Sequence, residues 1–131
     1  MKRIKDISIL LVDDDDMMRS FLRVILREVG AEQIHEVGTA DKALKFLMFN
    51  TIDLVFLDIN LPDADGVEFV KVIKENQPDC EVLMVSGEVT MERVQQITNS
   101  GAKGFIAKPF SAKTIEKKVT KILTELININ S

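Results

Sequence analysis

The sequence has no tryptophan, no tyrosine and a single cysteine, and each of these absences narrows what the chain can be. Seven phenylalanines supply all of the aromatic packing. Cys80 cannot form an internal disulfide, which suits a reducing compartment, so we expect a cytoplasmic protein. No apolar run approaches the ~18 residues that a membrane helix needs, so we expect no membrane insertion. Disulfide-rich secreted domains and membrane-spanning proteins are therefore disfavoured.

The charge and the size indicate an ordinary globular domain. The net charge of −4 gives the chain no attraction for nucleic acid, so direct nucleic-acid binding is not expected. The 131 residues, 46% of them apolar, suit one domain with one core. We predict a single domain over residues 1–131.

Short apolar runs alternate with segments of helical period along the chain. The runs over residues 7–12, 34–37, 53–58, 82–85 and 103–107 are expected to be strands. Apolar spacing, N-cap residues and glycines predict helices over 17–29, after Thr39, after Gly66, over 89–99 and from about Ser111. This alternation favours right-handed βαβ units and therefore a parallel α/β sheet that helices cover on both faces.

Charged or polar residues follow four of the predicted strands. An acidic run starting with Asp13 and Asp14 follows the first, Asp58 the third, Ser86 the fourth and Lys108 the fifth. Each alone has an ordinary explanation, such as a helix cap, a turn or a solvated lysine. Together they lie where parallel sheets of this kind form their binding crevice. Because clustered carboxylates repel one another, their combination predicts a divalent cation and a reactive carboxylate that can form an aspartyl phosphate.

With these residues, the chain resembles the receiver domain of two-component response regulators, and the resemblance covers nearly its whole length. It rests on residues 9–14, 57–62, 65–66, 85–87 and 108–110, in this order and spacing. The resemblance implies the flavodoxin-like (βα)5 fold, a doubly wound parallel sheet with strand order 2-1-3-4-5. It also implies a phosphorelay signalling domain that catalyses only its own phosphorylation and dephosphorylation.

The resemblance assigns the phosphoryl chemistry to particular residues. Asp58 would accept the phosphoryl group, and Lys108 and Ser86 would hold its oxygens. Mg²⁺ (or Mn²⁺) would be bound directly by Asp14, with Asp13 as a direct or water-mediated ligand, together with Asp58. Asn60 would give its backbone carbonyl to the metal.

A second group of residues would control the signal. Ser86 and Phe105 would form the switch, standing where the family often has threonine and tyrosine. Phosphorylation would remodel the face made by the fourth helix, the fifth strand and the fifth helix. Asn60 and Glu88 would flank the path of the hydrolytic water. Because both are polar, as in chemotaxis regulators, we expect rapid dephosphorylation.

The resemblance also implies the kinds of partner. The phosphoryl donor would be a sensor histidine kinase or a phosphotransfer protein. A downstream target or an output domain would bind the remodelled face, and the chain would be a monomer or a weak homodimer. Both a stand-alone receiver and one that belongs to a longer protein fit the sequence.

Three other functions fit the sequence less well, and one alternative stays open. A haloacid dehalogenase phosphatase needs a second aspartate where Asn60 stands, and no glycine-rich phosphate loop is present. A calcium loop beginning at Asp58 would need glycine where Asp63 stands. The open alternative is an interaction module that binds its partner regardless of phosphorylation.

Overall fold

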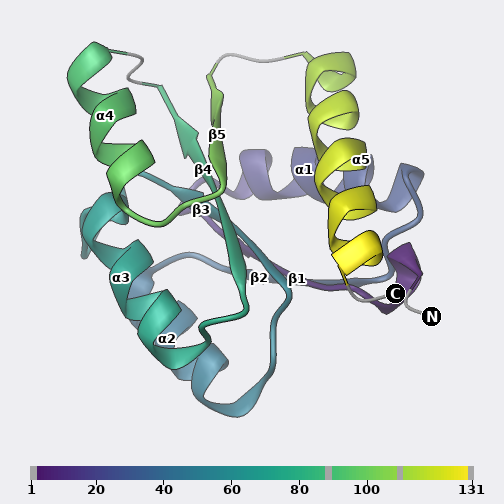
Figure 1. Cartoon of the computed structure of the whole chain (residues 1–131), viewed down its shortest axis with the longest axis horizontal. Coiled ribbons are helices and arrows are strands. Elements are labelled where there is room, and N and C mark those ends of the chain that lie inside the picture. Colours follow the sequence, from purple (N-terminus) through teal and green to yellow (C-terminus); the bar gives the residue numbers. More distant parts are fainter. Residues whose placement is uncertain (1–2, 88–89, 109–110, 130–131) are drawn as a thin grey trace.

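The protein is described here by a computed structural model that covers residues 3–87, 90–108 and 111–129 (Figure 1). A short 3-10 helix, Ile4–Asp6, precedes the alternating elements and was not predicted from the sequence. The strands and helices are β1 (Ser8–Val12), α1 (Asp16–Glu28), β2 (Gln33–Val37), α2 (Ala40–Phe49), β3 (Leu54–Asp58), α3 (Gly66–Asn76), β4 (Glu81–Ser86), α4 (Met91–Asn99), β5 (Gly104–Ala107) and α5 (Ala112–Ile129).

The strands form one parallel sheet in the order β2-β1-β3-β4-β5, which confirms the predicted fold class. Its register aligns the carboxyl ends of the strands. Val12 lies opposite Leu57, Asp58 opposite Val85, and Ser86 opposite Ala107. The polar residues that follow the strands are therefore brought to one edge of the sheet.

Helices cover both faces of the sheet, and each face has its own core. Figure 1 shows α1 and α5 on one side of the sheet and α2, α3 and α4 on the other. Ile9 and Leu11 of β1 belong to the core under α1 and α5, whereas Leu10 and Val12 belong to the core under the other three helices. Successive side chains of a strand point to opposite faces, so an unbroken apolar run is what a strand between two cores requires.

The predicted ends of the helices are largely confirmed. Asp15 caps α1 by accepting hydrogen bonds from the N–H groups of Met17 (2.9 Å) and Met18 (3.3 Å). The hydroxyl of Thr39 caps α2. Gly30 ends the turn after α1 with a φ of 106°, a conformation that side chains rarely adopt. Among the helices of the described residues, none is both long and apolar enough to cross a bilayer.

Candidate functional site

A buried pair of carboxylates and a lysine meet at the carboxyl edge of the sheet. The buried pair is Asp13, which directly follows β1 and is 3% exposed, and Asp58, which ends β3 and is 6% exposed. The Nζ atom of Lys108, just after β5, lies 3.6 Å from Asp13 Oδ2 and 3.5 Å from Asp58 Oδ1. Asp14 is exposed, yet its carboxylate and those of the buried pair each offer an oxygen within 4.8 Å of the others.

One carboxylate oxygen of the buried pair makes no hydrogen bond to the described residues. Asp13 Oδ1 accepts a hydrogen bond from the N–H of Asp15 (2.9 Å). Asp13 Oδ2 is buried and has no hydrogen-bond partner among the described residues, its nearest cation being the ammonium group of Lys108. Three carboxylates that each offer a hard oxygen, together with a buried Oδ2 atom that has no hydrogen bond among the described residues, fit Mg²⁺, which takes few carboxylates and keeps several waters.

Burial raises the pKa values of both members of the buried pair. For Asp58, burial acts most strongly, the charge of Asp13 adds to it, and Lys108 opposes both. For Asp13, burial again dominates, while the hydrogen bond from Asp15 and the charge of Lys108 lower the pKa in part. The lysine therefore does not compensate fully for the two buried charges, so the crevice favours a proton or a further cation.

The direction of these shifts determines how the pair contributes to stability. Both folded-state pKa values lie above the ordinary value of 3.8, so the folded chain binds these protons more readily than the unfolded chain does. Without a cation, the charged pair is destabilising at neutral pH. That penalty is relieved as the pH falls through the raised pKa values towards 3.8.

A backbone hydrogen bond joins Lys108, just after β5, to Ser86 at the end of β4. Ser86 is fully buried at the end of β4, and its carbonyl accepts a hydrogen bond from the N–H of Lys108 (2.7 Å). Gly87 follows, and a Cβ atom built there would meet nothing within 4 Å among the described residues. Gly87 is itself exposed, and no described residue would crowd a side chain at this position.

Gly66 sets the position of the chain that carries Asp58. Its N–H donates to the carbonyl of Ile59 (2.7 Å), so the first turn of α3 is pressed against the end of β3. A Cβ on Gly66 would lie 2.6 Å from the Asp58 carbonyl oxygen and 2.7 Å from Ile59 Cα. Only glycine permits this approach. Gly66 belongs to the 65–66 motif, but the motif alone does not explain why glycine is required there.

Asn60 lies beside Asp58. Its N–H donates to Asp58 Oδ1 at 3.4 Å, and its side chain is exposed at the rim of the crevice. Glu88, the other residue predicted to flank the water path, lies outside the described residues. Pro109 and Phe110 of the 108–110 motif lie outside them as well.

Phe105 has a contact that the sequence did not predict. Its ring is half-buried against the core under α4. Lys118 of α5 donates a hydrogen bond to the Phe105 carbonyl (2.6 Å), and its ammonium group lies 5.6 Å from the centre of the ring. This cation–π contact holds a ring that has no hydroxyl group of its own. Helix α4, beside Phe105, buries only one of its residues, Ile97, so α4 is loosely packed against the sheet.

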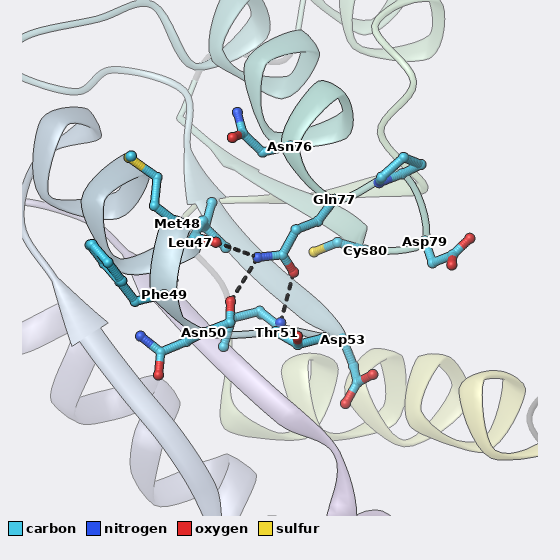
Figure 2. A pocket seen from close by; sticks show the side chains of 12 residues that line it. Leu47, Met48, Phe49, Asn50, Thr51, Asp53, Asn76, Gln77, Asp79 and Cys80 are labelled. Atoms are coloured by element: carbon cyan, nitrogen blue, oxygen red, sulfur yellow. Dashed lines mark hydrogen bonds between the residues drawn. The ribbon is translucent and has the colours of Figure 1, made fainter.

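A hollow of about 450 Å³ lies at the opposite edge of the sheet, between the segments that precede β3 and β4 (Figure 2). The side chain of Gln77 links the two segments. Its amide nitrogen donates to the carbonyls of Leu47 and Asn50, and its oxygen accepts from the N–H of Ile52. Cys80 is buried there, and burial raises its pKa to about 12. A thiol that stays protonated is a poor nucleophile, so the crevice remains the candidate site.

The fold and the acidic crevice are those of a receiver domain, and comparison with known proteins agrees. The family described as "Response regulator receiver domain" matches residues 9–120, so the chain belongs to this family. The chemotaxis protein CheY-3 of Vibrio cholerae serotype O1 is 33% identical over 124 residues, covering 93% of this chain and 95% of that protein.

Solved structures give the same result. A CheY-like receiver domain protein from Methanospirillum hungatei has a TM-score of 0.84 at 28% identity, covering 93% of this chain and 97% of that one. NtrX from Brucella abortus has a TM-score of 0.83 at 31% identity, and its match covers 94% of this chain but 28% of NtrX. The chain is thus a two-component signalling domain of a kind found alone and within longer proteins, and receiver domains bind Mg²⁺ at such an acidic pocket.

Proposed function

We propose that Asp58 accepts a phosphoryl group from the phosphohistidine of a sensor histidine kinase or phosphotransfer protein. The observation that carries the proposal is the Asp58 carboxylate, which lies at the open edge of the sheet with a lysine 3.5 Å away. In the reaction, an Asp58 oxygen forms a bond to phosphorus as the phosphorus–nitrogen bond breaks. The electron pair of the broken bond leaves with the imidazole, which takes up a proton.

The residues around Asp58 would stabilise the phosphoryl group and bind the metal. Lys108 provides a fixed positive charge for the phosphoryl oxygens, and Ser86 provides a hydroxyl group from the next strand. Asp13, Asp14, Asp58 and the carbonyl of Asn60 would hold Mg²⁺ (or Mn²⁺). When bound, the ion would neutralise the charge of the buried pair and of the transferred phosphoryl group.

The phosphoryl group then biases a switch. The added negative charge attracts the hydroxyl of Ser86, which frees space for the ring of Phe105 to turn inward. The loosely packed α4 supports this proposal, since few of its contacts must be broken. Inward rotation of the ring would break the contact between Lys118 and Phe105. The remodelled α4-β5-α5 face would bind a downstream target or an output domain.

The experiment that tests phosphoryl acceptance is labelling with acetyl phosphate and Mg²⁺, followed by intact-mass measurement. The wild-type protein should gain one phosphoryl group only when Mg²⁺ is present, and Asp58→Asn should gain none. Asp79→Asn is the matched control, because Asp79 is exposed near the opposite edge of the sheet and should leave labelling unchanged. Undiminished labelling of Asp58→Asn would refute the proposal. A wild-type protein that is never labelled would favour phosphorylation-independent binding.

A further inference from the structure

Arg19 of α1 connects the acidic loop to the neighbouring strand. Its guanidinium group donates to the backbone carbonyl of Asp13 and to the carboxylate of Asp16. Its Nε atom also donates to Glu36 Oε1 on β2 at 3.2 Å. The Arg19 side chain is 16% exposed, so its bonds to Asp13 and Glu36 are partly buried, whereas its bond to Asp16 lies at the surface. One planar group therefore joins three acceptors.

Arg23, one turn further along α1, anchors the other end of this network. Its Nε atom donates to Glu36 Oε2 at 2.6 Å, and its Nη2 atom donates to the carbonyl of Ile34 at 3.1 Å. In the described part of the chain, its hydrogen bonds and ion pairs do not reach residues 13–16. Both arginines therefore donate to Glu36, but within the described residues only Arg19 of the two bonds the acidic loop.

The network determines where Asp13 points its free oxygen. The N–H of Asp13 donates to the carbonyl of Val37 on β2 (3.2 Å), and its own carbonyl accepts from Arg19. Its Oδ1 atom accepts from the N–H of Asp15. With the backbone held from both sides and one carboxylate oxygen engaged, only Oδ2 remains to face Lys108 and the crevice.

The charge of Arg19 is matched within the network, so its influence is geometric. Asp16 and Glu36 supply two negative charges, and Arg19 and Arg23 supply two positive ones. A neutral cluster changes the potential at the crevice little, whereas a shift of the Asp13 backbone would move a candidate metal ligand. Hydrogen-bonding partners that orient ligands typically change metal affinity about 10–100-fold when they are removed.

We propose that Arg19 is a positioning residue for the metal site, acting through the backbone of Asp13. The inference rests on the proposed binding of Mg²⁺ by the crevice. A lysine at this position would keep the charge, but its single ammonium group cannot span all three acceptors. The proposal therefore predicts that Arg19→Lys will fail in the same way as a neutral replacement.

The test is Mg²⁺ titration calorimetry on the folded protein, well below the Tm of each variant. Arg19→Gln and Arg19→Lys should each weaken Mg²⁺ binding by about tenfold or more. Arg23→Gln is the matched control: it also loses a bond to Glu36, but it leaves the Asp13 carbonyl bonded and should bind Mg²⁺ as the wild type does. Glu36→Gln should show a smaller loss than Arg19→Gln.

A second readout needs no metal. The amide signal of Asp15 reports the Asp13 side chain, because the Asp15 N–H donates to Asp13 Oδ1. This signal should shift in metal-free Arg19→Gln and stay in place in Arg23→Gln.

Unchanged or tighter Mg²⁺ binding by Arg19→Gln would overturn the inference, and full rescue by Arg19→Lys would show that charge, not geometry, is what matters. A wild-type protein that binds no Mg²⁺ would instead overturn the metal site itself.

Discussion

Replacing Gly66 with alanine tests whether the end of β3 is held where the chemistry needs it. The new Cβ would lie 2.6 Å from the Asp58 carbonyl oxygen and 2.7 Å from Ile59 Cα. Ordinary contacts begin near 3.4 Å, so main-chain atoms of β3 would have to recede by roughly 0.8 Å. Backbone cannot swing aside as a side chain does, so we expect the upper part of the cost of overpacking, about 3 kcal/mol. For a domain of this size that is a fall in Tm of about 10 °C.

The same displacement should slow phosphoryl acceptance. A misplacement approaching 1 Å can cost about a hundredfold in rate, so we expect labelling by acetyl phosphate to slow by at least about tenfold at a temperature where the variant is folded. Gly104→Ala is the control, since its Cβ would make an ordinary 3.7 Å contact with Leu83. Urea unfolding and labelling rates measure both effects. Wild-type stability together with a wild-type rate in Gly66→Ala would refute this account of the glycine.

Three further predictions concern the cation, the switch and the lifetime of the signal. Mg²⁺ should raise the Tm, and the increase should shrink from about pH 7 towards about pH 4, because protons compete for the buried pair; a pH-independent increase would contradict this. Ser86→Ala should still be labelled, but beryllofluoride should no longer shift the NMR signals of the Phe105 ring; equal shifts in both proteins would count against the switch. Replacing Asn60 with methionine and Glu88 with leucine should lengthen the phosphoryl lifetime roughly tenfold, and unchanged decay would exclude control by these positions.

The fold was predictable because it depends on local patterns. The unbroken apolar run of β3 and the acidic run after β1 both reflect their place in a parallel sheet covered on both faces. Parallel pairing then aligns the strand ends, so the meeting of Asp13, Asp58 and Lys108 follows from the order of the strands. No long-range detail was needed to bring these side chains together.

The parts that were not predicted depend on partners from distant segments. The sequence does not show that Arg19 reaches Glu36, or that Lys118 lies over Phe105, because these pairs join different elements. Nor does the sequence show which member of the acidic pair is buried. The structure buries Asp13 and exposes Asp14, a distinction that depends on how the loop packs and not on residue type.

The most direct test of the central claim is chemical identification of the phosphorylated residue. The protein would be phosphorylated with acetyl phosphate and Mg²⁺ and then reduced with borohydride, which converts an aspartyl phosphate to homoserine. Peptide sequencing by mass spectrometry should find homoserine at position 58 and aspartate at positions 13 and 14. Homoserine at another aspartate, or none at any position of a protein that carries the label, would contradict the assignment of Asp58 as the acceptor.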